Sequence, residues 1–204
     1  MVEKLEEYSH KRDFARTPEP DGKASHPSDQ PIFVIQKHDA STLHYDFRLE
    51  VNGTLKSWAI PKGPSTDPRE KRLALPTEDH PLDYADFEGV IPEGEYGAGT
   101  VLVWDKGTYR NLRADKNDDS MSMAESLKDG KLEVWLEGEK LQGGYALIRT
   151  GAGHEERWLL VKMDDDAADA RRNPTSTEPK SVLSAQTLQE VANADENSKQ
   201  GNSQ

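Results

Sequence analysis

The sequence predicts a mainly all-β protein, folded as a small barrel or sandwich with one short helix. Two observations support this class. Segments of alternating apolar and polar residues recur through the middle of the chain, and turn signals separate them at intervals of roughly eight to twelve residues. The sequence has no cysteine, which excludes disulfides and cysteine-based zinc sites. We expect the barrel over residues 31–163, an extended, disordered N-terminal arm over 1–30, and a disordered acidic and polar tail over 164–204.

The predicted strands are short and follow one another closely. Two of them form a hairpin around Asn52-Gly53, because Asn-Gly is the strongest short-range hairpin signal. Lys106-Gly107 separates two later strands in a similar way. In chain order, the predicted strands are 32–37, 44–51, 54–60, 72–75, 100–104, 108–111, 131–137, 145–149 and 157–162.

The helix and the two ends of the chain are predicted from capping and composition. Ser120 caps a helix over Met121–Lys128, which ends at Asp129-Gly130. The arm is rich in Pro, Gly and Ser, and its residues 8–14 can dock on the barrel. Hydrophobic residues make up only 33% of the chain and charged residues 31%, which is lean for a fully folded chain. We therefore expect part of it to be disordered.

The charge and the apolar runs restrict the function. A net charge of −12 argues against a general nucleic-acid binder, which needs a broad basic face. It permits an enzyme that touches one end of a strand through a few arginines and lysines. The longest apolar runs, such as Val101–Trp104, are too short to span a membrane, and the N-terminus lacks the pattern of a signal peptide. We expect a cytoplasmic protein without membrane contact.

The most informative segment runs from Gln36 to Glu50. From His44 onward its residues alternate strictly, and successive side chains of a strand point to opposite faces. One face, from Tyr45 to Val51, is apolar and can be buried. The other face carries Asp46 and Arg48 beside the imidazole of His44. Placed in a barrel or cleft, this row is a candidate catalytic surface.

The polar residues on this face have two interpretations, and a metal site is the more specific one. His38, His44 and Asp46 can form a site of two histidines and one carboxylate, which leaves positions open for substrate or water. Arg48 shares the face and can bind an oxyanion through two hydrogen bonds. Alternatively, these are polar residues of a solvent-exposed strand, and His80 by itself is an ordinary turn histidine. Spacing alone indicates a metal–phosphate site on a small β domain.

Eight stretches of the chain form an ordered series of unusual motifs. They are Lys11–Phe14, Thr17–Pro20, Phe33–Glu50, Trp58–Pro64, His80–Tyr84, Phe87–Thr100, Gly130–Leu136 and Trp158–Lys162. Together they resemble the 3′-phosphoesterase domain of bacterial DNA ligase D and its stand-alone relatives. The resemblance covers residues 8–163.

The resemblance implies a compact β-barrel and a manganese-type divalent cation, with cobalt or zinc as alternatives. His38, His44 and Asp46 resemble its metal ligands. Arg48 and His80 resemble the residues that grip the phosphate, and His80 would donate either to a phosphate oxygen or to the leaving oxygen. The surrounding shell that contacts the substrate would be Arg12, Asp13, Gln36, Lys62, Arg72, Glu78 and Tyr84.

The resemblance also implies an activity. The family trims the 3′ ends of primer-template DNA or RNA–DNA: it removes a terminal ribonucleoside as a phosphodiesterase, then removes the 3′-phosphate to leave a 3′-OH. The Lys-x-Asp-Gly motif of ligase adenylylation is absent from the sequence. We therefore expect a monomeric, stand-alone enzyme that works beside a separate ligase or polymerase and an end-binding protein. Two other functions stay open, a non-catalytic DNA-end adaptor for a ligase and a cupin-like metal oxygenase.

Overall fold

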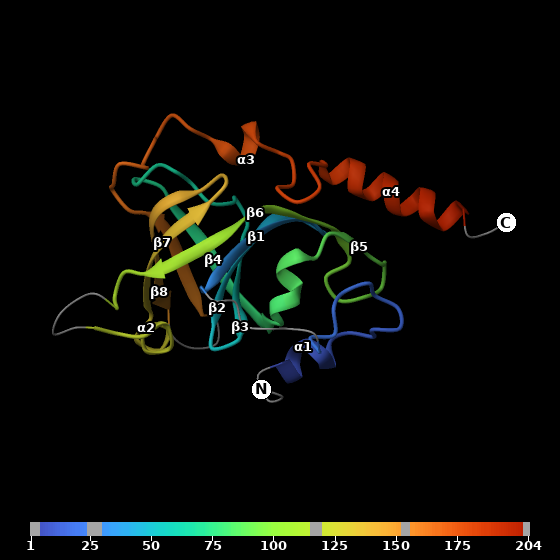
Figure 1. Ribbon diagram of the computed structural model, residues 1–204, viewed down its shortest axis with the longest axis horizontal. Coiled ribbons are helices and arrows are strands. Elements are labelled where there is room, and N and C mark those ends of the chain that lie inside the picture. Colours follow the sequence, from blue (N-terminus) through green and yellow to red (C-terminus); the bar gives the residue numbers. More distant parts are fainter. Residues whose placement is uncertain (1–4, 24–29, 115–119, 152–155, 202–204) are drawn as a thin grey trace.

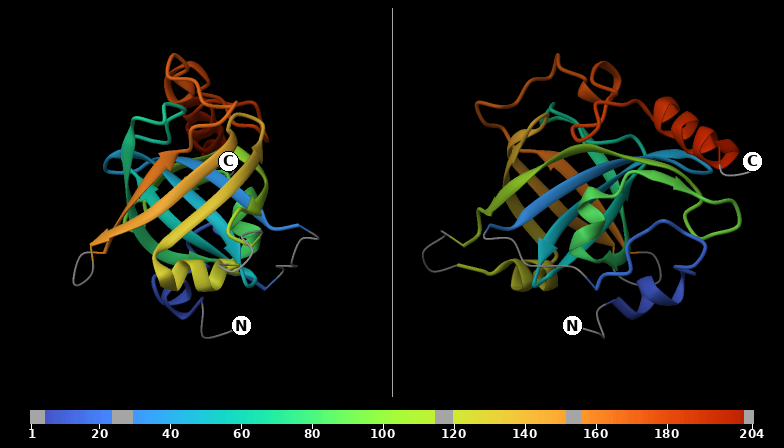
Figure 2. Two further views of the ribbon diagram at one scale, coloured as in Figure 1. Left: turned by 90° about the vertical axis from the view of Figure 1, so that its left-hand side faces the viewer. Right: turned by 45° about the vertical axis from the view of Figure 1, so that its right-hand side comes forward.

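Nine strands form one sheet in the part of the chain that the structure describes, residues 5–23, 30–114, 120–151 and 156–201 of a computed structural model (Figure 1). Eight of the strands close into a barrel in the order β1-β2-β3-β4-β9-β8-β7-β6, because β6 pairs again with β1. The short β5 lies outside this circle and pairs with the first residues of β6. The predicted all-β barrel is therefore confirmed (Figure 2).

The structure contains the predicted strands and helix together with further elements. The strands are β1 (Ile32–Asp39), β2 (Leu43–Val51), β3 (Thr54–Ile60), β4 (Lys71–His80), β5 (Gly89–Ile91), β6 (Gly99–Asn111), β7 (Lys131–Gly138), β8 (Gln142–Gly151) and β9 (Arg157–Lys162). The helices are α1 (Glu6–His10), the 3₁₀ helix η2 (Leu82–Asp86), α2 (Met123–Asp129), α3 (Pro174–Thr177) and α4 (Leu188–Gly201). The predicted hairpin joins β2 to β3. In the described part of the chain, every helix is too short or too polar to cross a membrane.

β4 is longer than the predicted strand, 72–75, because it continues through Pro76 to His80. Proline and the charged residues after it interrupt the apolar pattern, so the sequence did not indicate this extension. The pairing of β4 with β3 shifts register between Thr77 and His80. A bulge of this kind changes the direction of side chains next to it. Consistent with this, the neighbouring residues Thr77 and Glu78 both line the cleft, together with His80.

β6 is one continuous strand, so the predicted break at Lys106-Gly107 is wrong. Gly107 pairs with Phe33 of β1 on one side and with Gly138 of β7 on the other. A Cβ atom at Gly107 would lie 2.1 Å from the carbonyl oxygen of Glu137. The glycine therefore permits a close approach of two strands, which a sequence pattern cannot distinguish from a turn.

α2 begins two residues later than predicted, and its cap is Ser122 rather than Ser120. The Ser122 hydroxyl accepts a hydrogen bond from the backbone N–H of Glu125, and the Glu125 side chain accepts one from the backbone N–H of Ser122. This reciprocal capping box satisfies two donors that the helix leaves free. Ser120 instead donates to the carbonyl of Ala114.

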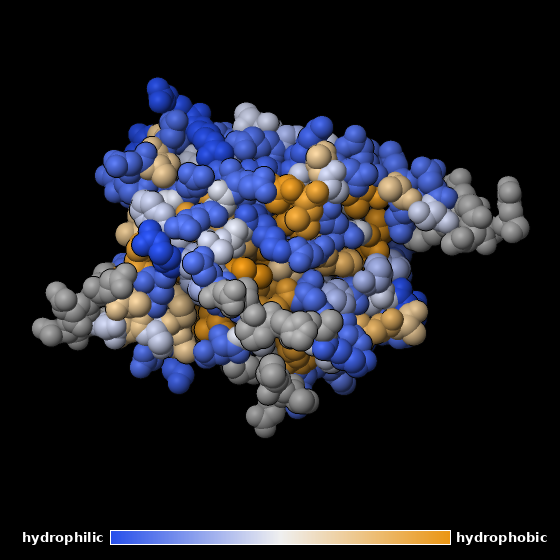
Figure 3. Space-filling model, in the orientation of Figure 1, coloured by the Kyte–Doolittle hydropathy of each residue, from blue (hydrophilic) through white to orange (hydrophobic). Residues whose placement is uncertain are grey.

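Two apolar clusters lie on the two sides of the barrel wall. The inner cluster fills the barrel and includes Tyr45, Phe47 and Leu49, the face of β2 that was predicted to be buried. The outer cluster includes Val34 of β1 and Tyr84 of η2, and it fills the space between the barrel wall and the elements that cover it. The polar face of β2 therefore faces outward, toward this covering layer. On the face shown in Figure 3, hydrophilic side chains predominate and apolar ones surface in patches.

The described part of the arm, residues 5–23, is ordered against the barrel. Tyr8 of α1 is fully buried in the outer cluster, and its hydroxyl donates to the carbonyl of Pro20 at 2.7 Å. The expected docking of residues 8–14 is therefore observed. Residues 5–23 thus pack on the barrel where a disordered arm was expected, and the parts of that expectation that fall on 1–4 and 24–29 lie outside the described residues.

The tail also differs from its prediction, because residues 164–201 lie on the barrel end opposite α1 (Figure 2). Lys162 is 0% exposed, and its ammonium group donates to Asp165 Oδ1 at 2.6 Å. Trp104 donates to the carbonyl of Glu178 at 2.7 Å, and Val191 belongs to the inner cluster. A few anchors fix this segment by accepting hydrogen bonds from buried donors. Average composition does not detect such anchors, so the segment was expected to be disordered.

We expect Asp165→Ala to lower the free energy of unfolding by about 1.5–3 kcal/mol, because it leaves the buried ammonium of Lys162 without its carboxylate. Urea titration followed by tryptophan fluorescence measures the difference. Asp169→Ala is the matched control, since its partner Arg171 is exposed, and it should behave as wild type. Equal midpoints for wild type and Asp165→Ala would show that the tail is not anchored by this pair.

The same pair predicts a pH dependence. Burial raises the pKa of Asp165, but hydrogen bonds from Lys162 and from the backbone N–H groups of Gly144 and Ala167 outweigh burial and lower the pKa below 3.8. A carboxyl whose pKa is lowered by folding stabilises the protein above its unfolded pKa and loses this contribution as the pH falls through its folded pKa. The stability difference between wild type and Asp165→Ala should therefore shrink below pH 3.8. Urea titrations over a pH series test this, and a constant difference down to the lowest pH would contradict it.

Candidate active site

A cleft of about 270 Å³ lies on the outer wall of the barrel, between the polar face of β2 and the covering layer. Its floor comes from β1, β2, β3 and the end of β4, and its walls come from the arm, η2 and the loop that follows β5. The lining residues are Arg12, His38, Ala40, His44, Asp46, Arg48, Ala59, Thr77, Glu78, His80, Tyr84, Ile91, Tyr96 and Gly97.

His38, His44 and Asp46 meet at one point of this cleft, as predicted. His38 lies directly opposite His44 in the antiparallel pair of β1 and β2, and Asp46 is two residues further along the same face of β2. One potential ligand atom from each residue lies within 4.8 Å of the others. The Nδ1 atom of His38 is 3.6 Å from Asp46 Oδ2, and the Nε2 atom of His44 is 3.7 Å from Asp46 Oδ1. Two imidazoles and a carboxylate at this spacing fit a divalent cation.

Each histidine is oriented by a hydrogen bond from the ring nitrogen that faces away from Asp46. Nε2–H of His38 donates to the carbonyl of Gly97 at 2.9 Å, and Nδ1–H of His44 donates to the carbonyl of Thr42 at 2.8 Å. These acceptors assign the tautomers, because a carbonyl requires a proton on the nitrogen that faces it. The remaining lone pairs lie on the nitrogens that face Asp46. This is the outer-shell arrangement of histidines that ligate metals.

Arg48 lies beside Asp46 and is almost completely buried, with 3% of its side chain exposed. Its Nε donates to Gln36 at 2.8 Å, Nη1 donates to Ser57 at 2.8 Å, and Nη2 donates to Asp46 at 3.1 Å. Gln36 is held in turn by the carbonyl of Tyr84 at 2.9 Å. Nη1 also lies 3.0 Å from Nδ1 of His80, so of the five N–H donors of the guanidinium one hydrogen on Nη2 is left for a further partner. The group is therefore fixed in position with one donor available to the cleft.

The charges of the cleft keep Asp46 ionised. Burial alone raises the pKa of its carboxyl, but the guanidinium of Arg48 and the two imidazoles outweigh burial and hold the pKa far below its usual range. A carboxylate in this state is an anionic donor for a cation.

His80 is neutral in this structure. Burial and the guanidinium groups of Arg48 and Arg12 lower its pKa well below the ordinary value of 6.5. Its Nδ1 lies 2.9 Å from the carbonyl oxygen of Glu78 and 3.0 Å from Nη1 of Arg48, and its Nε2 lies 3.4 Å from Nη2 of Arg12. The imidazole is therefore enclosed by one carbonyl acceptor and two guanidinium donors.

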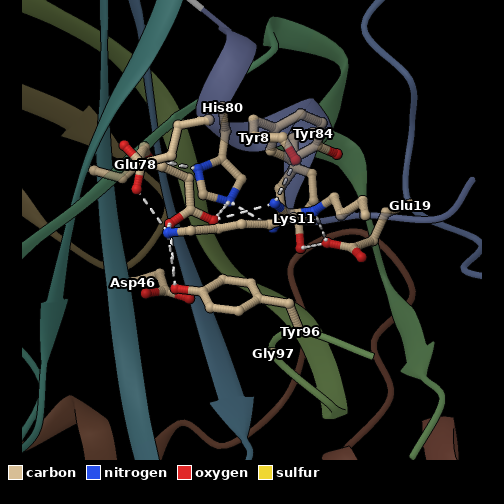
Figure 4. Close-up of polar contacts among 12 residues, drawn as sticks. Tyr8, Lys11, Glu19, Asp46, Glu78, His80, Tyr84, Tyr96 and Gly97 are labelled. Atoms are coloured by element: carbon tan, nitrogen blue, oxygen red, sulfur yellow. Dashed lines mark hydrogen bonds and ion pairs between the residues drawn. The ribbon is translucent and has the colours of Figure 1, made fainter. Parts of the chain in front are cut away.

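The arm closes the side of the cleft through an ion-pair network (Figure 4). Arg12 is 4% exposed and lies between Glu19 at 2.8 Å and Glu78 at 3.1 Å. The hydroxyl of Tyr84 donates to Glu19 at 2.9 Å, and the Arg12 guanidinium lies 3.8 Å from the centre of the Tyr8 ring. Arg12, Glu78 and Tyr84 were predicted to surround the site, and the structure brings them together.

Several residues of the cleft were not predicted. Glu19 belongs to the motif Thr17–Pro20, and a carboxylate between two prolines in a polar arm was the available signal. Lys11 lies 3.3 Å from Glu78 and 3.4 Å from the hydroxyl of Tyr96. Gly97 contributes a backbone carbonyl, which no side-chain motif can indicate.

Three predicted residues lie outside the cleft. Asp13 is exposed and accepts a hydrogen bond from the backbone of Ala15. Lys62 is exposed in the turn after β3. Arg72 is at the other end of β4 from His80, where it pairs with Glu70. Sequence motifs place these residues near the site in chain order, but the strands carry them away from it.

The fold and the cleft define a closed β-barrel with a candidate metal site beside a buried arginine on its outer wall. Comparison with known proteins gives the family. The family model described as the DNA ligase D 3′-phosphoesterase domain matches residues 36–149, more than half of the chain. This chain therefore belongs to the DNA ligase D 3′-phosphoesterase domain family.

Similar proteins support the same family. The multifunctional non-homologous end joining protein LigD of Pseudomonas aeruginosa is 52% identical over 189 residues, which cover 90% of this chain and 22% of that protein. The corresponding LigD proteins of Mycobacterium tuberculosis and Mycolicibacterium smegmatis are 45% identical over 164 residues and 42% identical over 172 residues. These alignments cover 80% and 81% of this chain and 20% and 21% of the relatives. The chain thus spans about a fifth of the length of these relatives.

We expect His44→Ala to weaken the binding of Mn²⁺ by more than the roughly 10- to 100-fold typical of a lost outer-shell contact, because it removes one of three donors. Titration calorimetry measures the affinity, and circular dichroism checks the fold. His10→Ala, on an exposed position of α1, is the control and should bind Mn²⁺ as wild type does. An unchanged affinity in His44→Ala would place the cation elsewhere.

Proposed function

We propose that this protein is a divalent-metal-dependent phosphoesterase that acts on the 3′ ends of primer-template DNA or RNA–DNA. It removes a 3′-terminal ribonucleoside as a phosphodiesterase and then releases the 3′-phosphate to give a 3′-OH. One observation carries the proposal: the donors of His38, His44 and Asp46 lie in the same cleft as the buried Arg48 and His80. Membership of the 3′-phosphoesterase family supports it.

The donor set is chemically suited to Mn²⁺, with Co²⁺ and Zn²⁺ as alternatives, because all three accept imidazole and carboxylate ligands. A cation held by His38, His44 and Asp46 would supply charge stabilisation to a phosphoryl oxygen and lower the pKa of water. The carboxylate of Asp46 is kept ionised for this purpose by Arg48.

Arg48 serves as the phosphate clamp in this proposal. Gln36, Ser57 and Asp46 already hold its guanidinium, so it does not reorganise when charge develops on the phosphate. The remaining hydrogen on Nη2 can donate to a phosphate oxygen in the plane of the guanidinium, and a second donor becomes available if Nη1 exchanges its contact with His80 for the phosphate.

His80 has a proton-transfer or hydrogen-bonding role in this proposal. Before substrate binds, its neighbours Arg48 and Arg12 keep it neutral. The negative charge of a phosphate offsets these two guanidinium groups, so the imidazole gains a proton. It then donates to a phosphate oxygen or to the leaving oxygen.

The charge balance of the cleft supports recognition of a strand end rather than of a long duplex. Arg12 is neutralised by Glu19 and Glu78, and Arg48 is paired with Asp46. The whole chain carries a net charge of −12, so it cannot neutralise many phosphates. We propose that any contacts from Asp13, Lys62 or Arg72 reach only the nucleic acid outside the cleft.

The names of the relatives support a role for this protein in DNA end joining. They are described as multifunctional non-homologous end joining proteins. We propose that this protein prepares 3′ ends for a ligase or polymerase in the cytoplasm, together with an end-binding protein, and that it acts as a monomer. The oriented histidines favour hydrolysis over a non-catalytic adaptor, which requires no metal donors. The buried Arg48 favours a phosphate over the substrates of an oxygenase.

The direct test is incubation of a labelled primer-template that ends in one ribonucleotide, with chelator and with Mn²⁺. We expect a 3′-phosphate product and then a 3′-OH product with Mn²⁺, and no product in excess chelator. Full turnover in chelator would overturn the metal dependence. No product at any metal concentration would overturn the proposed activity.

We expect Arg48→Lys to lower the rate by about 10²–10³, because lysine keeps the charge but loses the planar pair of donors. The affinity for Mn²⁺ should change little, since Arg48 is not a donor to the cation. Arg110→Lys is the matched control, because Arg110 is exposed and pairs with Glu137 on the barrel surface. Near-normal turnover of Arg48→Lys on both ester substrates would move the phosphate clamp to another residue.

A further inference from the structure

Tyr96 stands at the rim of the cleft and has no part in the chemistry described above. Two tyrosines line the cleft: Tyr84 is 2% exposed and bonded to Glu19, whereas Tyr96 is 47% exposed. Among the described residues, Tyr96 is the aromatic side chain that remains openly exposed. An exposed ring contributes little to the packing of the barrel, and at this place it is accessible to a ligand in the cleft.

The ring of Tyr96 is held in place from one side. The ammonium group of Lys11 lies 4.5 Å from its centre, and the guanidinium group of Arg12 lies 5.6 Å from it. The hydroxyl lies 3.4 Å from both Lys11 Nζ and Glu78 Oε2, and Figure 4 shows it pointing toward the cleft floor. Cations over a ring restrict its orientation. The ring is therefore a preorganised flat surface rather than a free side chain.

The backbone links this ring to the metal donors. The next residue, Gly97, has a positive φ of 76° and directs its carbonyl to the imidazole of His38. The position of Tyr96 is thus set, one residue away, by the same loop that orients a metal ligand. A ring fixed in this way lies at a constant place relative to the phosphate site.

We propose that Tyr96 is a stacking platform for a nucleobase, and that this base belongs to the nucleotide that remains on the DNA after cleavage. The proposal rests on the proposed phosphoesterase function. Aromatic side chains beside nucleic-acid sites stack on bases with little regard to sequence. Arg48 and His80 are buried in the cleft, whereas Tyr96 is exposed among its lining residues, so a strand that leaves the phosphate site past Tyr96 can place a base on the ring. In this proposal the terminal nucleoside, which is a chain end, lies on the other side of the phosphate.

The test compares three primer-templates that end in one ribonucleotide: one with every base, one without the base of the terminal ribonucleotide, and one without the base of the preceding nucleotide. Wild type, Tyr96→Leu and Tyr96→Phe are assayed on each with Mn²⁺. We expect Tyr96→Leu to raise KM roughly 10- to 100-fold on the first two substrates with little change in kcat. On the third substrate, Tyr96→Leu and wild type should have the same KM.

Tyr96→Phe is the matched control, because it retains the ring and loses only the hydroxyl, and it should resemble wild type throughout. A penalty for Tyr96→Leu that is equal on all three substrates would overturn stacking and indicate a structural role. A penalty that disappears only when the terminal base is missing would overturn the assignment to the retained nucleotide. Inactivity of wild type on every substrate would overturn the proposed function itself, and this inference with it.

Discussion

The antiparallel register of β1 and β2 is the constraint on which the rest of the structure depends. It places His38 opposite His44 and brings Asp46 onto the same face, two residues away. The same register sends Phe47 into the barrel interior. A slip of one residue would exchange the two faces, so that the imidazoles would enter the apolar core and the aromatic rings would enter the cleft. One pairing therefore determines both the packing and the chemistry.

Residues of the N-terminal arm complete the cleft that the barrel wall forms. A barrel wall alone presents its donors to open solvent, where electrostatic interactions are weak. Arg12 and Glu19 come from a segment that precedes the first strand, and they join Glu78 at the end of β4. Their network covers one side of the cleft and reduces the exposure of its charges. The strength of the interactions in the cleft thus depends on residues that are distant in the chain.

The sequence predicts the parts of the structure that local patterns determine. Strict alternation located β2 and its two faces, and Asn52-Gly53 located the hairpin. The rest depends on tertiary contacts. Gly107 allows two backbones to approach closely, which resembles a turn signal. The tail is held by isolated anchors such as Asp165. Chain order likewise cannot show that Glu19 pairs with Arg12 beside the cleft while Arg72 stays at the distant end of its strand.

The placement of the cleft on the outer wall has a consequence for evolution. Alternate residues of the same strands serve two separate purposes, since the inward set fills the core and part of the outward set lines the cleft. Substitutions among the residues that line the cleft leave the volume of the barrel interior unchanged, so the chemistry of the cleft can change without loss of the fold. In an enzyme whose pocket lies inside its barrel, the same change would disturb the packing. In this architecture, the mutations that change the cleft and the mutations that destabilise the fold therefore fall on different residues.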